Sequence, residues 1–322
     1  MDRKVELIAT GDVDKLRITD CEPQQPASDE LRIRHEGTGV NFIDIYQRTG
    51  LYPLPLPAVL GVEGAGVVEA VGAEVSDIHV GDRIAYAGIP GAYAATRLLP
   101  AWRAIKLPDG ISTKMAAASF LRGLTAHMLL TRTYPVKGGE TLLIHAAAGG
   151  LGATLTRWAK HLGCTVIGTT GSPEKADIVR ANGADHVIVG READIVSQID
   201  QLTKARGVDF AIDGIGGEVL RKTLACVRRF GVAASIGQAA GPIPPISVEE
   251  LGPIRSLSLA RPSVMAYAAE QETYRFATQA VIAAIGQGII QNAGNEYALT
   301  EAARAQSDLE SGKTVGSIVL VP

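Results

Sequence analysis

Two patterns of hydrophobic and polar positions divide the chain. Up to about residue 110, short apolar runs are separated by glycine, proline and aspartate, which is typical of short strands joined by turns. From Glu140 onward, continuous β-branched runs alternate with amphipathic segments of helical period. Buried strands separated by helices predict a parallel sheet that is covered on both faces. We therefore expect an α/β protein with a doubly wound parallel sheet in its second part.

The expected elements follow from these runs. In the first part, strands are predicted at residues 4–9, 31–37, 66–72, 82–88 and 92–99. In the second part, strands are predicted at 141–146, 165–170, 185–189, 208–213, 231–237 and 256–260, with helices at 149–163, 172–183 and 191–207. Ser112 is expected to cap one long helix that continues to residue 130. Residues 264–287 are expected to be helical, and a helix from Thr300 should precede a closing strand at 316–322.

Composition and charge narrow the classes of protein to consider. Apolar residues make up 46% of the chain and charged residues 20%, and the net charge is −3 without a basic block. Nucleic acid and anionic membranes are therefore not expected as partners. Cys21, Cys164 and Cys226 are scattered, and the N-terminus lacks the apolar core of a signal peptide. We expect a soluble, cytoplasmic protein.

The segment HAAAGGLG (145–152) lies between a predicted strand and a predicted helix. Within it, Ala147-x-Gly149-x-x-Gly152 matches a dinucleotide fingerprint in which alanine replaces the first glycine. Gly149 would let the backbone approach a pyrophosphate, Gly152 would let the helix pack on the strand, and the helix N-terminus attracts the anion. The cofactor contacts expected in this loop are Ala148, Gly149, Gly150, Leu151 and Gly152.

Two other glycine clusters have different contexts. GVEGAGVVEAVG (61–72) runs into an alternating strand, which favours barrel geometry over phosphate binding. DGIGGEVL (213–220) follows a strand and precedes a helix, so it would lie at the same crevice of a doubly wound sheet, although a simple turn is equally compatible. We expect further cofactor contacts at Gly214, Thr125 and Gln238.

The end of the second parallel strand indicates which nicotinamide cofactor is used. An acidic residue there would accept a hydrogen bond from the ribose 2′-hydroxyl and favour NAD. This chain instead has Thr169, Thr170, Gly171 and Ser172, with Lys175 a little further on. Hydroxyl groups and a cation can hold a 2′-phosphate, so the sequence favours NADPH. A solvated helix residue is the alternative for Lys175, because Ser172 and Pro173 would begin a helix there.

The stretch GVNFIDIYQRTGLYP (39–53) places several polar side chains among apolar neighbours. It contains Asn41, Asp44, Arg48, Tyr46 and Tyr52. One interpretation is a solvated surface helix that runs into a proline turn, with Tyr46 packed in the core. The other is the polar wall of a reaction pocket, in which a tyrosine phenol donates to an oxygen that gains charge.

Taken together, these residues resemble the medium-chain dehydrogenase/reductase superfamily, and within it the zinc-independent quinone oxidoreductase branch that includes ζ-crystallin. The resemblance runs nearly end to end, through NFIDIYQRTGLYP, LGVEGAGVVEAVG, GDRIAY, AAASFLRGLTAHMLL, HAAAGGLG, RPS and LESGKTVGSIVL. It implies a GroES-like β-barrel domain of residues 1–110 with 288–322, and an inserted Rossmann domain of residues 111–287. It also implies a homodimer through edge strands of the Rossmann sheet.

The resemblance also implies roles for individual residues. Metal-dependent relatives carry zinc ligands where this chain has Asn41 and Val62, so no metal is expected. The segment with Tyr46 and Tyr52 would lie beside the nicotinamide, with Asn41 as a second polar contact to the substrate. Asp44 would hold the loop or Arg48, and Arg261 would add positive charge. Gly190 and Gly312 stand where some relatives place groups that grip the 2′-phosphate, which leaves Lys175 as the main candidate.

The resemblance implies an NADPH-dependent quinone reductase without catalytic zinc. A quinone is electron-poor, and the phenolate formed on reduction spreads its charge by resonance, so hydrogen-bond donors in a dry cleft would suffice. A second interpretation is reduction of an activated C=C bond in an enone, enal or enoyl thioester. A third, of a different class, is a cofactor-binding structural or RNA-binding protein on the same scaffold.

Overall fold

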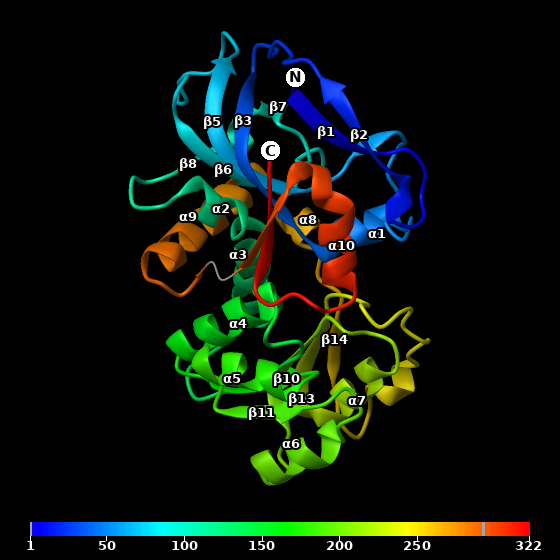
Figure 1. Ribbon diagram of the computed structural model, residues 1–322. Coiled ribbons are helices and arrows are strands. Elements are labelled where there is room, and N and C mark those ends of the chain that lie inside the picture. The colour runs from blue at the N-terminus through cyan, green and yellow to red at the C-terminus, as the bar shows by residue number, and fades with distance from the viewer. Residues whose placement is uncertain (1, 292–293) are drawn as a thin grey trace. The chain divides into compact units, whose positions relative to one another are not determined.

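The structure is a computed structural model that describes residues 2–291 and 294–322. The chain forms two compact units, Met1–Leu124 with Val264–Pro322, and Thr125–Ser263 (Figure 1). No helix within the described ranges is long and apolar enough to cross a membrane.

The first unit is built on sheets that are antiparallel except for the parallel pair β15 and β16. Its strands are β1 (Asp2–Leu7), β2 (Leu16–Cys21), β3 (Glu30–Val40), β4 (Ala58–Val59), β5 (Glu63–Val71), β6 (Arg83–Ala87), β7 (Thr96–Pro100), β8 (Ile105–Lys106), β15 (Gly294–Ala298) and β16 (Ser317–Val321). Its helices are α1 (Phe42–Arg48), α2 (Thr113–Ala117), α8 (Val264–Tyr267), α9 (Gln271–Gly286) and α10 (Ala302–Glu310), while α3 (Phe120–His127) crosses the division between the units.

Strand β3 organises the larger sheet of the first unit. The sheet runs in the order β15-β16-β3-β5-β6-β8, with β7 also paired to β3, and β2-β1-β4 form a second sheet. A Cβ atom added at Gly66 in β5 would lie 1.9 Å from the carbonyl oxygen of Arg34 in β3. Glycine is therefore required there by close strand packing, which confirms barrel geometry for the GVEGAG segment.

The second unit is a doubly wound parallel sheet. Its strands are β9 (Thr141–Ile144), β10 (Thr165–Thr170), β11 (His186–Val189), β12 (Val208–Asp213), β13 (Val227–Ser235) and β14 (Ser258–Ala260); its helices are α4 (Gly150–His161), α5 (Pro173–Ala181), α6 (Ile195–Thr203) and α7 (Val219–Cys226). The strand order is β11-β10-β9-β12-β13-β14. This is the order of a Rossmann fold, with the reversal between β9 and β12 where ligands bind.

The two faces of this sheet are covered by different helices. Ile195 and Ile199 of α6 and Leu224 of α7 pack with Leu143 and Val208 in one buried cluster. Helix α4 packs against β9 and β10, and α5 against β10 and β11 (Figure 1). The fold class expected from the sequence, a GroES-like barrel with a Rossmann sheet, is thus confirmed.

The prediction of a single helix from Ser112 to residue 130 is wrong. The segment instead forms α2, α3 and a π-helical turn, Met128–Thr133. The backbone N–H of Leu121 donates to Oε2 of Glu63 at 2.8 Å, so a carboxylate from β5 satisfies an amide at the start of α3. A long-range contact therefore begins a new helix where local propensity predicts continuation.

One further expectation about elements needs correction, and strands β2, β4, β8 and β15 were not expected. The helical segment 264–287 is interrupted between α8 and α9. Strand β15 was not expected, because the sequence GNEYA has too few apolar residues to show an alternating pattern.

The boundaries of the two compact units differ from the boundaries of the expected domains. Helix α2 packs against β3 and β5, and the hydroxyl of Tyr274 in α9 donates to the carbonyl oxygen of Arg103 at 3.0 Å. These contacts group residues 111–124 and 264–287 with the first unit. The domain boundaries at 110/111 and 287/288 stay a prediction.

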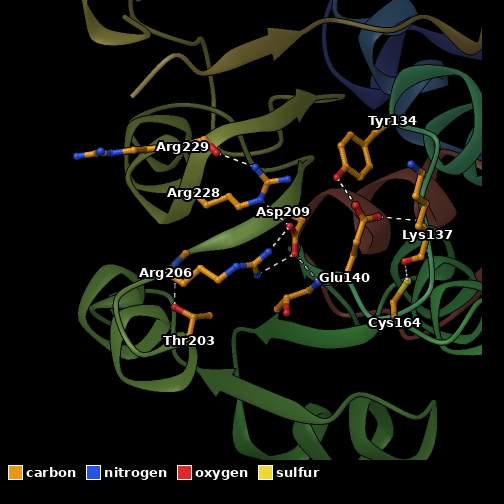
Figure 2. A network of polar contacts seen from close by, with 11 residues as sticks. Tyr134, Lys137, Glu140, Cys164, Thr203, Arg206, Asp209, Arg228 and Arg229 are labelled. Atoms are coloured by element: carbon orange, nitrogen blue, oxygen red, sulfur yellow. Dashed lines mark hydrogen bonds and ion pairs between the residues drawn. The ribbon is translucent and has the colours of Figure 1, made fainter. Parts of the chain in front are cut away.

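The amino ends of the parallel strands are joined by a polar network (Figure 2). Asp209 accepts from the backbone N–H of Thr141 at 2.8 Å, from Arg206 at 2.6 and 3.0 Å, and from Nε of Arg228 at 2.6 Å. Beside it, the phenol of Tyr134 donates to Glu140 at 2.6 Å. This network lies at the amino ends of the strands, whereas ligands of doubly wound sheets bind at the opposite, carboxyl ends.

Candidate active site

The loop after β9 has the geometry of a nucleotide-binding turn. Helix α4 begins at Gly150 with Gly149 as its N-cap, and the N–H of Ala147 donates to Thr169 O at 2.9 Å. A Cβ atom on Gly152 would lie 2.4 Å from the carbonyl oxygen of Ala146, so only glycine lets α4 pack on this turn. At Gly149 the nearest atom to an added Cβ is 3.3 Å away. The loop can thus present backbone amides to an anion.

A directed chain of hydrogen bonds joins three strand ends in the second unit. The ring of His145, at the end of β9, contacts the Thr169 hydroxyl through Nδ1 at 3.1 Å and the Thr223 hydroxyl through Nε2 at 2.9 Å. Thr223 Oγ1 lies 2.8 Å from Oδ2 of Asp213, and Oδ1 of Asp213 accepts from the amides of Ile215 and Gly216.

Proton accounting fixes the direction of this chain. The Thr223 hydroxyl lies 2.9 Å from Val219 O as well, but its single proton goes to the carboxylate, the stronger acceptor. It must then accept from Nε2–H of His145, and Nδ1 must accept from Thr169. Burial lowers the pKa of His145, so the ring is neutral at pH 7. Asp213 thereby holds the second glycine turn, and the chain links that turn to His145 at the start of the first, a role that sequence reasoning did not assign.

The end of β10 holds the residues expected to select the cofactor. Ser172 is the N-cap of α5, Pro173 is its first residue, and Lys175 lies in its first turn. A Cβ atom added at Gly171 would lie 3.5 Å from Cγ and from Nε of Arg191, which sequence reasoning did not consider. Thr170 pairs with Val189, so Arg191 follows β11 close to the end of β10, a position that depends on the strand register and not on the local sequence.

Except for Thr125, the remaining expected residues of the second unit lie at neighbouring strand ends. Nη1 of Arg261 donates to Oγ of Ser235 at 2.8 Å and to the Gly237 carbonyl at 3.4 Å. An added Cβ on Gly216 would lie 2.7 Å from Cα of Gln238, so the turn after Gly214 packs directly on Gln238. Thr125 lies in α3.

Within the stretch 39–53, helix α1 of the first unit covers Phe42–Arg48 and is buried from Asp44 to Arg48, whereas residues 49–53 are exposed. The helix is therefore not solvated, although Tyr46 is packed in the core as the first interpretation expected. Asp44 is fully buried, and its Oδ2 accepts from the backbone N–H of Asn41 at 2.8 Å and from the phenol of Tyr93 at 2.9 Å. Arg48 is 1% exposed and contacts Gln306, Gly11 and Glu310. Arg48 thus ties α1 to α10, without a bond to Asp44.

The two tyrosines of this stretch pack ring against ring. The Tyr46 and Tyr52 centroids are 5.3 Å apart with an interplanar angle of 71°. Tyr46 is 8% exposed and Tyr52 is 37% exposed, so Tyr52 is the more accessible of the two.

Glu63 is a buried acid that sequence reasoning did not assign a role. Its Oε1 accepts from the side-chain amide of Asn41 at 2.7 Å, while Oε2 accepts from Leu121. Burial raises the pKa of both Glu63 and Asp44 to about 7. The signal in the sequence was a lone acid within the apolar GVEGAG strand.

Metal chemistry depends on ligand type. Asn41 and Val62 stand at the expected ligand positions, and neither supplies a thiolate or an imidazole. Within residues 2–291 and 294–322, no three His, Cys, Asp or Glu side chains gather in a metal-binding group. A metal-free site stays a prediction.

Comparison with known proteins places the chain in a family. A family model described as alcohol dehydrogenase GroES-like domain matches residues 27–109, and one described as zinc-binding dehydrogenase matches residues 150–281. A quinone oxidoreductase of Pseudomonas aeruginosa is 41% identical over the full length of both chains. A 2-haloacrylate reductase of a Burkholderia species is 39% identical over 92% of both.

A solved structure gives the same answer. The Escherichia coli quinone oxidoreductase complexed with NADPH superposes with a TM-score of 0.96 at 38% identity, covering 99% of this chain and 100% of that one. Sequence identity of this level over the whole length, together with both family models, shows that the chain belongs to the quinone oxidoreductase branch of the medium-chain dehydrogenase/reductase superfamily.

Proposed function

We propose that this protein is an NADPH-dependent quinone reductase that works without catalytic zinc. The observation that carries the proposal is the full-length similarity to quinone oxidoreductases, one of them solved with NADPH. The absence of a carboxylate from Thr169 to Ser172, at the end of β10, supports the choice of NADPH over NADH.

Residues of the second unit would hold NADPH, which supplies a hydride when bound. The amides of Gly149, Gly150 and Leu151 at the start of α4 would receive the pyrophosphate. Ser172 and Lys175 would receive the adenosine phosphate, while Ala148, Gly152, Gly171, Gly214, Gln238 and Thr125 complete the expected contacts. The close packing at Gly152 and Gly216 fits this assignment, because it keeps side chains out of both turns: Gly152 packs on Ala146 and Ala147, and Gly216 on Gln238.

Residues of the first unit would bind the substrate oxygen as it gains charge. A phenol of Tyr46 or Tyr52 would donate to it, and Asn41 would give a second polar contact. The bond from Asn41 to Glu63 fixes the orientation of the Asn41 amide. Arg261 belongs to the second unit, donates to Ser235 there, and would add positive charge.

Reduction of an activated C=C bond is the second candidate. The observation that favours it is the 39% identity to a 2-haloacrylate reductase. A conjugated carbonyl also gains negative charge on oxygen when hydride adds to its β-carbon, so the same phenol donors would serve both substrates.

The test is oxidation of NADPH by the purified protein against a panel of quinones, enones, enals and enoyl thioesters. Turnover of quinones is expected, and preference for conjugated C=C substrates would replace the proposal by the second candidate. NADPH binding without turnover of any substrate would favour the structural or RNA-binding role. In the active protein, Tyr46→Phe or Tyr52→Phe should lower kcat about ten- to a thousandfold while NADPH affinity is retained.

A homodimer through the edge of the parallel sheet is also part of the proposal. Strand β14 is an edge strand of the sheet in the described part of the chain. Large apolar side chains are exposed close to it. The backbone N–H of Phe230, which is 75% exposed, donates to the carbonyl oxygen of Arg255, and the neighbouring Ile254 is 77% exposed. An unpaired edge with exposed apolar residues favours pairing with a second copy.

A cytoplasmic location completes the proposal. Cys21, Cys164 and Cys226 are all free thiols, and Cys164 and Cys226 are buried. Free cysteines without a disulfide framework are typical of a reducing compartment.

A further inference from the structure

We propose that Arg191 binds the 2′-phosphate of NADPH and sets the preference of this protein for NADPH over NADH. This inference rests on the proposed function and names the group that recognises the phosphate. Sequence reasoning assigned that task to Lys175.

The pairing of β10 and β11 brings Arg191 to the phosphate side of the sheet. Thr170 is paired with Val189, and the N–H of Gly190 donates to Thr170 O at 2.8 Å. The chain then continues into Arg191, whose Cγ and Nε lie 3.5 Å from the Cβ position of Gly171. Because Gly171 has no side chain, the arginine lies directly beside the backbone that follows β10.

The conformation of Gly190 disfavours a side chain at that position. Gly190 has φ of +113°, a value that residues with a side chain rarely adopt. A group at position 190 would therefore strain this turn. The chain places its side chain one residue later, at Arg191, where the turn directs it to Gly171.

Charge favours Arg191 as an anion-binding group. Arg191 is exposed, and across residues 2–291 and 294–322 it makes no hydrogen bond or ion pair. By contrast, Arg180 on neighbouring α5 is paired with Asp177 at 2.8 Å. A guanidinium presents several donors in a plane and can bind phosphate through two of them.

The other candidates at this strand end are less suited to act alone. The Ser172 hydroxyl bonds to Glu174 and lowers the pKa of that carboxyl, so the hydroxyl is already engaged. Lys175 supplies a single ammonium group without the planar geometry of arginine. Arg191 and Lys175 together would surround the phosphate with two cations.

The experiment measures binding rather than turnover. NADPH and NADH are titrated calorimetrically into the wild type, Arg191→Ala, Arg191→Lys, and Arg180→Ala as a control that removes the same charge from α5. The fragments 2′,5′-ADP and 5′-AMP are titrated in parallel, since they differ by the 2′-phosphate alone. Arg191→Ala should weaken NADPH and 2′,5′-ADP about 10- to 100-fold, the loss expected for one charge-assisted contact, and leave NADH and 5′-AMP little changed.

The controls separate the possible outcomes. Partial recovery in Arg191→Lys and wild-type binding in Arg180→Ala would support a direct contact. If Arg191→Ala keeps the wild-type ratio of NADPH to NADH affinity, or if Arg180→Ala loses as much, the assignment of Arg191 is wrong while the proposed function stands. A wild type that binds neither nucleotide would overturn both.

Discussion

At the scale of single residues, buried polar groups determine the chemistry of both units. His145, Asp213, Asp44 and Glu63 are nearly inaccessible to water, yet each has a specific hydrogen-bond partner. A buried polar group without a partner is costly, so each of these contacts fixes the position of the segments that it joins.

The direction of the His145 chain leads to a spectroscopic prediction. In the wild type, nitrogen-15 NMR should show a protonated Nε2 and an unprotonated Nδ1 on His145, unchanged from pH 6 to 8 because burial lowers the pKa of the ring. Thr223→Ser keeps the hydroxyl and should keep the tautomer. Thr223→Val removes it and should disturb the Nε2 signal and weaken NADPH binding. An Nδ1–H tautomer in the wild type would contradict the proposed direction.

The raised pKa of Asp44 leads to a prediction about stability and pH. Burial raises this pKa from an ordinary value near 4 to about 7, so the folded state holds the proton more tightly than the unfolded chain. The protonated Asp44 therefore adds its full contribution to the free energy of unfolding below pH 4. This contribution is lost progressively as the pH rises from 4 through 7. The amide side chain in the variant Asp44→Asn cannot ionise, so the variant does not lose this contribution. The free energy of unfolding of Asp44→Asn minus that of the wild type should therefore increase by roughly 2 kcal/mol from pH 5 to pH 8.

Denaturant unfolding of both proteins at the two pH values measures this change. Asp177→Asn, at an exposed position of α5, is the matched control and should differ from wild type by the same amount at both pH values. A constant difference between Asp44→Asn and wild type would mean that Asp44 is ionised in the folded protein throughout this range.

At the scale of elements, the amino ends and the carboxyl ends of the parallel strands differ in their contacts. The amino ends of β9, β12 and β13 are joined through Asp209, which is 1% exposed (Figure 2). Burial alone would raise the pKa of Asp209, but its bonds to Arg206, Thr141 and Arg228 lower it below the ordinary value. The carboxyl ends instead lead into glycine turns.

Removal of the Asp209 charge should therefore affect stability and not cofactor choice. Asp209→Asn leaves Arg228 without its buried partner, and we expect a loss of about 3–5 kcal/mol in the free energy of unfolding. Arg206→Ala removes a half-exposed partner and should cost about 1 kcal/mol or less. Chemical denaturation measures both values. A changed ratio of NADPH to NADH affinity in either variant would show that the amino edge influences the cofactor site.

The elements show where sequence reasoning succeeds and where it does not. The parallel strands and their helices were predictable because buried β-branched runs and amphipathic helices have strong local patterns. The break between α2 and α3 was not, because its cause is Glu63, 58 residues away in the sequence. In the same way, Arg191 and the His145 chain depend on strand pairing, whereas the glycine loop at 145–152 follows from the local sequence.

At the scale of the whole molecule, the exposed edge of β14 predicts self-association. Ile254→Asp places a charge at the apolar surface beside this edge and should shift the protein from dimer to monomer in light scattering. Val80→Asp is the matched control, since Val80 is 62% exposed in the first unit, and it should leave the mass unchanged. A monomeric wild type, or a dimer that persists in Ile254→Asp, would contradict the proposed interface.

The distance between the amino ends and the carboxyl ends of the parallel strands has a consequence for protein engineering. Strand β10 is six residues long, which corresponds to about 20 Å between its ends. Effects of substitutions at such a distance usually add, because the residues share no neighbours. A variant library could therefore vary the residues around Gly171 and Arg191 to change coenzyme use, and separately strengthen the Asp209 edge to offset any loss of stability, without testing every combination.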